Sequence, residues 1–201
     1  GSEMCIRDRY NSKRETWARQ VKEDKEYRLG RQWTNQQIET LKARGQAPIV
    51  VNRIHPAVET AKAMLTANRP SFRCAPREDS DNKVANVMSA LLSYIYDVSN
   101  GRAVVRQAVD DYYVCGVGYV QCYQDSLADM GKGEVKIKDI DPLDVYVDPN
   151  SRDRFFDDAE NVIVSRLFTK DQAEAMYPDY ARKIKNAGGN YDDKYPETQA
   201  Y

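Results

Sequence analysis

Basic and aromatic side chains alternate in the N-terminal third, a composition that can neutralise phosphates and stack on bases. The candidates for such contacts are Arg14, Arg19, Arg28, Arg31, Trp33 and Arg44. The same residues could instead meet another subunit, and a solvated helix face that buries its rings has the same composition. The pattern therefore leaves three interpretations open: a nucleic-acid face, a subunit interface and an ordinary surface helix.

Carboxylates gather near residues 148–160, where they could suggest a calcium loop. Counted from Asp148, however, the sixth residue is Asp153 where such a loop has glycine, and the twelfth is Ala159 where it has glutamate. A hand-type site is therefore disfavoured, and we predict no metal site. Because hard cations also accept carboxylates on irregular loops, weak cation candidates remain. They are Asp148, Asp153, Asp157 and Asp158.

No arrangement of residues predicts catalysis. A metal-dependent nuclease needs carboxylates that converge on a metal pair about 4 Å apart, and nothing in the spacing of Asp110, Asp111, Asp141 and Asp148 forces them together. The only histidine, His55, is followed directly by proline, which makes a histidine-assisted nucleophile a weak hypothesis. The paired glycines lack phosphate-loop spacing, and the four cysteines include no CxxC pair. We expect no enzyme and no cofactor.

The chain of 201 residues has a net charge of −1 that hides an asymmetry. Residues 1–77 carry 16 Lys and Arg against 8 Asp and Glu, whereas residues 78–201 carry 14 against 23. The hydrophobic share of 41% is low for a self-sufficient core, so we expect burial to be completed by another subunit or by further chain. No apolar run approaches the roughly 18 residues of a membrane span, and we expect no membrane contact.

The order of the expected elements predicts an α+β fold. Helical periodicity marks residues 13–29, 56–66 and 81–100, and a further helix ends at Gly116 and Gly118. The last two helices should form a hairpin over about 81–116. Alternation then predicts an antiparallel β-meander over about 117–168, with Val135 and Ile137 on its dry face, and a capping box at Thr169 opens a short C-terminal helix. Residues 49–51 form a further candidate strand.

We expect three regions along the chain. Residues 1–12 are a non-native or disordered leader, 13–187 form an incomplete α+β region, and 188–201 are a polar tail that is cut before the chain is finished.

Several turn, cap and core signals, in their order and spacing, resemble the N-terminal part of podovirus-type bacteriophage portal proteins, the head-to-tail connectors. The resemblance covers residues 27–178. Its motifs include Gln32-Trp33, Arg44, Asn52-Arg53, Pro56, Asn68-Arg69-Pro70, Asp111, Gly116, Gly118, Asp141-Pro142, Asp148-Pro149, Arg152 and Asp157-Asp158.

The resemblance implies a non-enzymatic structural subunit of a ring, typically of twelve copies, at the unique capsid vertex. Such a ring forms the channel for DNA packaging and ejection. Its implied partners are further copies, terminase, scaffold or capsid protein, tail factors and the double-stranded DNA in the channel. Its implied location is the virion, and the host cytoplasm during assembly. This stretch resembles the wing region, with the stem and clip later in the chain.

The charge asymmetry adds a hypothesis to this resemblance: the basic N-terminal third of one subunit meets the acidic remainder of its neighbour. The alternative function is a nucleic-acid-binding module that uses the same basic third.

Overall fold

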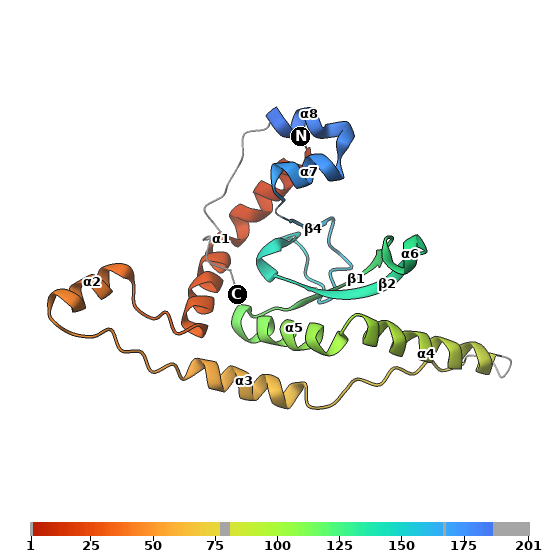
Figure 1. Ribbon diagram of the computed structural model, residues 1–201, viewed down its shortest axis with the longest axis horizontal. Coiled ribbons are helices and arrows are strands. Elements are labelled where there is room, and N and C mark those ends of the chain that lie inside the picture. Colours follow the sequence, from red (N-terminus) through yellow and green to blue (C-terminus); the bar gives the residue numbers. More distant parts are fainter. Residues whose placement is uncertain (1, 77–80, 167, 187–201) are drawn as a thin grey trace. The chain divides into compact units, whose positions relative to one another are not determined.

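The structure is a computed structural model that describes residues 2–76, 81–166 and 168–186, with side chains from residue 6 onward (Figure 1). The chain divides into two compact units, residues 1–164 and 165–201, and the expected region 13–187 spans their boundary. Helices and two small antiparallel sheets together make an α+β fold, as predicted.

Helix α1 (Ser2–Arg28) includes most of the segment that we expected to be a leader. Tyr10 is only 1% exposed, and Arg7 donates a hydrogen bond of 3.3 Å to the hydroxyl of Tyr146. Helix α1 disagrees with the disordered alternative for residues 2–12, whereas the non-native alternative for this leader stays a prediction. A long-range packing contact accounts for this order, because the ring of Tyr10 lies in the interior of this unit.

Helix α2 (Asn35–Ala43) was not predicted, although a capping box marks its start. The Thr34 hydroxyl accepts from the backbone N–H of Gln37, whose side chain accepts in return from the backbone N–H of Thr34. The candidate strand 49–51 is extended but pairs with no strand among the described residues. Helix α3 (Ile54–Leu65) follows it, as expected from residue 56 onward.

Helices α4 (Asn82–Val98) and α5 (Gly101–Cys115) confirm the two predicted helical stretches. Asn100, with a left-handed φ of 51°, lies between them. Figure 1 shows the two helices running on one after the other instead of lying side by side, so the expected hairpin does not form. α5 packs mainly against α1, α3 and strand β2 instead. α4 contacts α5 and β2, but most large apolar side chains of its stripe stay exposed.

Strands β1 (Tyr119–Asp125) and β2 (Glu134–Ile140) pair antiparallel around the short segment α6 (Ala128–Gly131), as predicted. Cys122 lies opposite Ile137, which places Val120 and Val135 on the same face as that pair. This face was expected to be dry, yet Val135 is 49% exposed while Lys136 on the other face is half-buried. Lys136 is held there by a 2.9 Å ion pair with Asp125.

The expected single meander divides into two sheets. The 3₁₀ turn η2 (Pro142–Asp144) interrupts the chain after β2, and β3 (Val145–Val147) then pairs antiparallel with β4 (Val162–Val164). Asp141 accepts a 2.9 Å hydrogen bond from the backbone N–H of Leu143, which fixes the turn. A capped turn after Asp141 therefore redirects the chain before it can add a third strand to the first sheet.

The core of this unit lies where α1, α5 and the η2 turn meet. Val21, Cys115 and Leu143 are its buried residues, and Trp17 packs against them. The indole Nε1 of Trp17 donates a 3.1 Å hydrogen bond to the carbonyl of Cys115, so the ring is both packed and satisfied.

The second unit contains α7 (Lys170–Met176), the 3₁₀ turn η3 (Pro178–Tyr180) and α8 (Ala181–Asn186). The capping box is confirmed: the Thr169 hydroxyl accepts from the Gln172 N–H, and the Gln172 side chain accepts from the Thr169 N–H. The expected tail 188–201 lies outside the described residues.

Candidate subunit interface

Arg14 is used inside the chain. Its guanidinium donates to the carbonyl oxygens of Leu143 and Val145, and at 3.3 Å to that of Pro142. The same group lies over the ring of Tyr146, 3.8 Å from its centroid. Arg14 therefore fastens α1 to the η2 turn and β3, and little of its guanidinium is left for an external partner.

Arg28 is the second basic candidate that is engaged inside the chain, and it is buried, with 8% of its surface exposed. It pairs with Glu59 at 2.6 Å and with Asp110 at 3.0 Å, and it also contacts the Nδ1 of His55. Lys62 reaches the same two carboxylates, at 2.6 Å and 2.8 Å. These contacts form a four-charge network of Arg28, Lys62, Glu59 and Asp110 that joins α1, α3 and α5.

The network sets the ionisation of its members. Burial raises the pKa of Asp110, but hydrogen bonds from Lys62 and Arg28 outweigh it and hold the pKa below its ordinary value. Hydrogen bonds from Lys62 and Arg28 likewise lower the pKa of Glu59. Burial opposes the charge of Lys62, and its two carboxylate partners still raise its pKa overall. Glu59, Lys62 and Asp110 are therefore charged at neutral pH.

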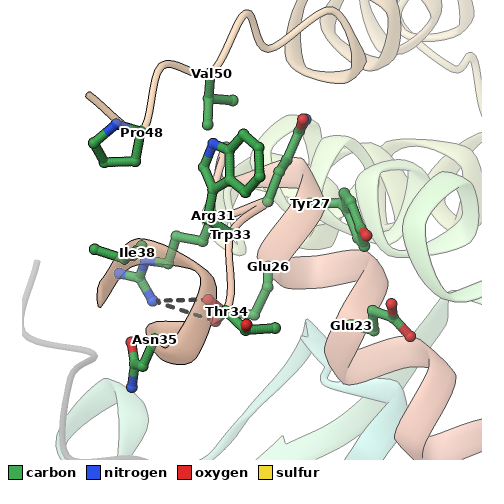
Figure 2. A pocket seen from close by; sticks show the side chains of 12 residues that line it. Glu23, Glu26, Tyr27, Arg31, Trp33, Thr34, Asn35, Ile38, Pro48 and Val50 are labelled. Carbon is green, nitrogen blue, oxygen red and sulfur yellow. Dashed lines mark hydrogen bonds and ion pairs between the residues drawn. The ribbon is translucent and has the colours of Figure 1, made fainter. Parts of the chain in front are cut away.

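Arg31 and Trp33 lie together at a groove of about 650 Å³ between the end of α1, α2 and the extended segment 48–50 (Figure 2). Arg31 pairs with Glu26 at 3.2 Å, and the indole of Trp33 donates a 3.2 Å hydrogen bond to the carbonyl of Ile49. The apolar part of the lining consists of Tyr27, Trp33, Ile38, Pro48 and Val50.

Arg19 and Arg44 are exposed and do not line this groove. The structure thus separates the six candidates: it brings Arg31 and Trp33 together, engages half-buried Arg14 and buried Arg28 inside the chain, and leaves the other two apart on the surface. A single continuous basic and aromatic face does not form from this set.

The acidic loop after β3 uses its carboxylates on its own backbone. Asp158 accepts from the Ser151 hydroxyl at 2.6 Å and from the N–H groups of Arg152 and Asp153, and these bonds lower its pKa. The carboxylate of Asp153 accepts from the N–H of Phe155 at 2.9 Å and from that of Asp157 at 3.2 Å. Asp153 and Asp158 are therefore capping groups of this loop, whereas Asp157 takes part through its backbone N–H.

Asp148, at the start of this loop, is 6% exposed and accepts from the N–H groups of Asn150 and Glu160. It thereby ties the two ends of the loop together. Within the part of the chain that the structure describes, no three His, Cys, Asp or Glu side chains are grouped to hold a metal ion.

The nominal nuclease carboxylates serve different structural contacts. Asp110 belongs to the four-charge network, and Asp141 caps the η2 turn and pairs with Lys25 at 2.7 Å. Asp111 is 7% exposed and accepts a 3.3 Å hydrogen bond from Gln107. Burial raises its pKa to about 6, and the positive charge of Lys25 opposes that rise only in part.

Asn52 connects two elements, which explains its place among the sequence motifs. Its side-chain nitrogen donates to the carbonyl of Arg28 at 3.0 Å, and its oxygen accepts from the N–H groups of Ile54 and His55. It therefore caps α3 against the end of α1. Pro56 stands at the third residue of α3, where the helix needs no N–H from it.

Gly116 and Gly118 have different roles. Gly116 ends α5 with a left-handed φ of 80°, as predicted for a helix stop. A Cβ atom on Gly118 would stand 2.0 Å from the carbonyl oxygen of Ala108, so this glycine permits the close approach of β1 to α5. Of the remaining motif residues, Pro142 is buried, and Pro149 and Arg152 lie exposed in the acidic loop.

An exposed apolar stripe lies on α4, the helix that periodicity predicted over residues 81–100. Its large side chains are between 42% and 66% exposed. They are Val84, Val87, Leu91, Tyr94 and Val98. Helical periodicity identified the stripe, but it carries no information on whether the stripe is covered by the same chain or by another one.

A comparison with protein-family models matches residues 4–200 to the phage P22-like portal protein family. The chain belongs to this family. Portal proteins of phages are structural proteins of the capsid vertex, so the predicted structural role, the oligomeric ring and the location in the virion are confirmed at that level. No curated protein matches the chain closely enough to add a named relative.

Because portal proteins are structural, the surfaces of this chain are its candidate functional regions. A portal subunit works through contacts with further copies, and exposed apolar side chains such as those of α4 suit such contacts. No helix within the described residues is long and apolar enough to cross a membrane.

Proposed function

We propose that this chain is a subunit of a closed portal ring, of about twelve copies as in its family, which forms the channel for DNA packaging and ejection and a docking site for terminase and tail factors. In this proposal the protein has no catalytic step of its own, and its work is mechanical. The ring assembles in the host cytoplasm and remains in the virion.

The observation that carries the proposal is the exposed apolar stripe of α4 on a chain of the portal family. Exposed apolar area of this extent on a soluble chain marks an interaction surface. In a ring every subunit contacts two neighbours through two different faces. A neighbouring copy of the same chain can therefore cover the stripe, and no other protein is needed.

The opposite net charges of the N-terminal third and the remainder of the chain support a head-to-tail contact. Fewer basic residues are available for this contact than the sequence suggested. Arg14 and Arg28 are engaged inside the chain, so the basic partners that we propose for the acidic remainder of a neighbour are Arg19, Arg31 and Arg44. Reversal of Arg28 would test folding and not the interface, because its side chain is only 10% exposed within the four-charge network.

Electron microscopy and native mass spectrometry of the intact protein test this proposal directly. We expect closed rings for the unchanged protein and for Asn86→Asp, an exposed polar change on α4, and monomers for Leu91→Asp. Each variant should keep its circular dichroism spectrum, because Leu91 is 46% exposed. Rings that form as well with Leu91→Asp as without it would exclude the α4 stripe as an interface, and monomers of the unchanged protein would exclude the ring.

The alternative, a nucleic-acid-binding module, is separated by a titration with duplex DNA at two salt concentrations. A module that neutralises phosphates loses affinity steeply with salt. We expect no binding of duplex DNA by single subunits, and salt-dependent binding that is lost with Arg19→Glu and Arg44→Glu would favour the alternative.

A further inference from the structure

The turn between β1 and β2 holds two apolar side chains far out in solvent. Leu127 is 87% exposed and Met130 is fully exposed, at 101%. No other large hydrophobic side chain in the described part of the chain reaches these values. The two residues lie at the tip of a hairpin whose strands are held by seven register pairs, so the tip projects from a stiff support (Figure 1).

The backbone of this tip is strained in a way that fixes the position of Met130. Asp129 and Met130 have φ values of 47° and 54°, and Gly131 and Gly133 continue with 89° and 87°. Left-handed conformations are unfavourable for residues with a Cβ atom, and they persist where the position has a use. The Asp129 carbonyl accepts a 3.2 Å hydrogen bond from the N–H of Lys132, which closes a turn over residues 129–132 that contains Met130.

The groove beside Trp33 is the complementary feature. Its volume of about 650 Å³ is larger than the tip's two apolar side chains need, and Figure 2 shows Tyr27, Trp33, Pro48 and Val50 around it. Trp33 and Tyr27 are 39% and 36% exposed, so aromatic surface is available. Thioether sulfur packs well against aromatic rings, and methionine adapts to irregular apolar spaces.

The charges at the tip and at the groove are also complementary. Glu23 lies exposed on the lining of the groove, whereas Glu26 is already paired with Arg31. At the tip, Lys132 is 79% exposed, and its contact with Asp129 is long at 3.5 Å. Lys132 of one copy can therefore pair with Glu23 of another at the rim, while the apolar side chains occupy the interior of the groove.

We propose that the β1–β2 tip of one subunit, Leu127 to Lys132, inserts into the groove beside Trp33 of the adjacent copy. The inference rests on the proposed ring, because a projecting patch and a groove at different places on one chain make a head-to-tail contact that repeats around a closed ring. The strained tip and the groove are then the two halves of one contact.

Cysteine cross-linking of the intact protein tests this contact. Met130→Cys combined with Ile38→Cys places one thiol at the tip and one in the lining of the groove. Under mild oxidation we expect a ladder of cross-linked subunits on a non-reducing gel. The matched control is Met130→Cys with Met64→Cys, since Met64 is also exposed, at 74%, but lies on α3 away from the groove lining. The unchanged protein, with free Cys74, Cys115 and Cys122, gives the background.

A charge exchange provides a second readout that needs no new thiol. Lys132→Glu alone and Glu23→Lys alone should each lower the salt concentration at which rings dissociate, and the double variant should restore it. Rings without a cross-linked ladder above the control, or a double variant no better than the singles, would overturn the proposed contact and leave the ring intact. A cross-link within one subunit would also overturn it, and the absence of any rings would remove both proposals together.

Discussion

Gly118 and Ala108 are in backbone contact: a Cβ atom on Gly118 would stand only 2.0 Å from the Ala108 carbonyl oxygen. This approach seats the first strand on α5, the helix that also packs against α1 and α3. Because backbone atoms cannot move aside as a flexible side chain can, the contact makes residue 118 sensitive to any added atom.

Gly118→Ala should therefore destabilise the protein by about 3 kcal/mol, because the new methyl group forces β1 away from α5. Chemical denaturation followed by circular dichroism measures the change. Gly45→Ala is the matched control, because nothing lies within 4 Å of its added Cβ and only its φ of 70° is unfavourable. The control should lose about 1 kcal/mol. Equal losses for the two variants would mean that the close approach is not the cause.

Arg14→Lys should destabilise the protein by about 2 kcal/mol, since an ammonium group cannot reproduce a planar fork on several carbonyls while stacking on Tyr146. The same substitution at exposed Arg19 should change stability by less than about 0.5 kcal/mol. Thermal unfolding of both variants measures the difference. A loss at Arg19 as large as that at Arg14 would contradict a fastening role for Arg14.

The buried carboxyl of Asp111 predicts a pH dependence. Its folded pKa of about 6 lies above the ordinary 3.8, so between these values the folded state binds more protons than the unfolded state, and stability falls as pH rises. Above pH 7 the penalty is about 3 kcal/mol. Asp111→Asn should remove it, with a gain in stability at pH 8 that shrinks towards pH 4.

Unfolding midpoints of this variant across pH 4.5 to 8 are the measurement, in a range chosen to stay above the lowered pKa values of Glu59 and Asp110. Asp139→Asn, an exposed change on β2, is the control and should follow the unchanged protein at every pH. If Asp111→Asn shows the same pH slope as the unchanged protein, burial of Asp111 does not control stability.

Two carboxylates, Asp110 and Asp97, allow a direct comparison of ion pairs with buried and with exposed basic partners. Asp110→Asn removes a partner from Arg28 and Lys62, whose side chains are 10% and 13% exposed, and should cost about 2 kcal/mol. Asp97→Asn removes the partner of Arg69 from a pair that is 60% and 57% exposed, and should cost less than about 0.5 kcal/mol. Similar losses in urea unfolding would show that the network adds nothing beyond a surface pair.

The hydrogen bonds of the acidic loop predict that calcium does not stabilise the protein. Because Asp148, Asp153 and Asp158 accept hydrogen bonds from the loop backbone, we expect millimolar calcium to leave the melting temperature unchanged. Asp158→Ala should speed hydrogen exchange at the N–H groups of Arg152 and Asp153, whereas Asp157→Ala should not. Calcium-dependent stabilisation that Asp158→Ala abolishes would reinstate a cation site.

The sequence by itself determined the local structure wherever the cause lies within a few residues. The Thr169 capping box, the helix stop at Gly116 and the left-handed residue Asn100 follow from side-chain and backbone preferences that act over one turn. The antiparallel pairing of β1 with β2 follows in the same way from alternation and a short connection. The capping box of Thr34 and Gln37 is an equally clear local signal for the start of α2.

Only the tertiary structure decided which of these surfaces are covered. Arg14 and Arg28 lie on the same helix as exposed Arg19, α1, among similarly polar neighbours in the sequence. Their acceptors are nevertheless distant along the chain: Val145 is 131 residues from Arg14, and Glu59 is 31 residues from Arg28. The stripe of α4 has the periodicity of a core helix, yet its large apolar side chains are exposed, although α4 contacts α5 and β2. Periodicity and charge fix which face of an element is apolar or basic, whereas long-range packing decides what that face meets.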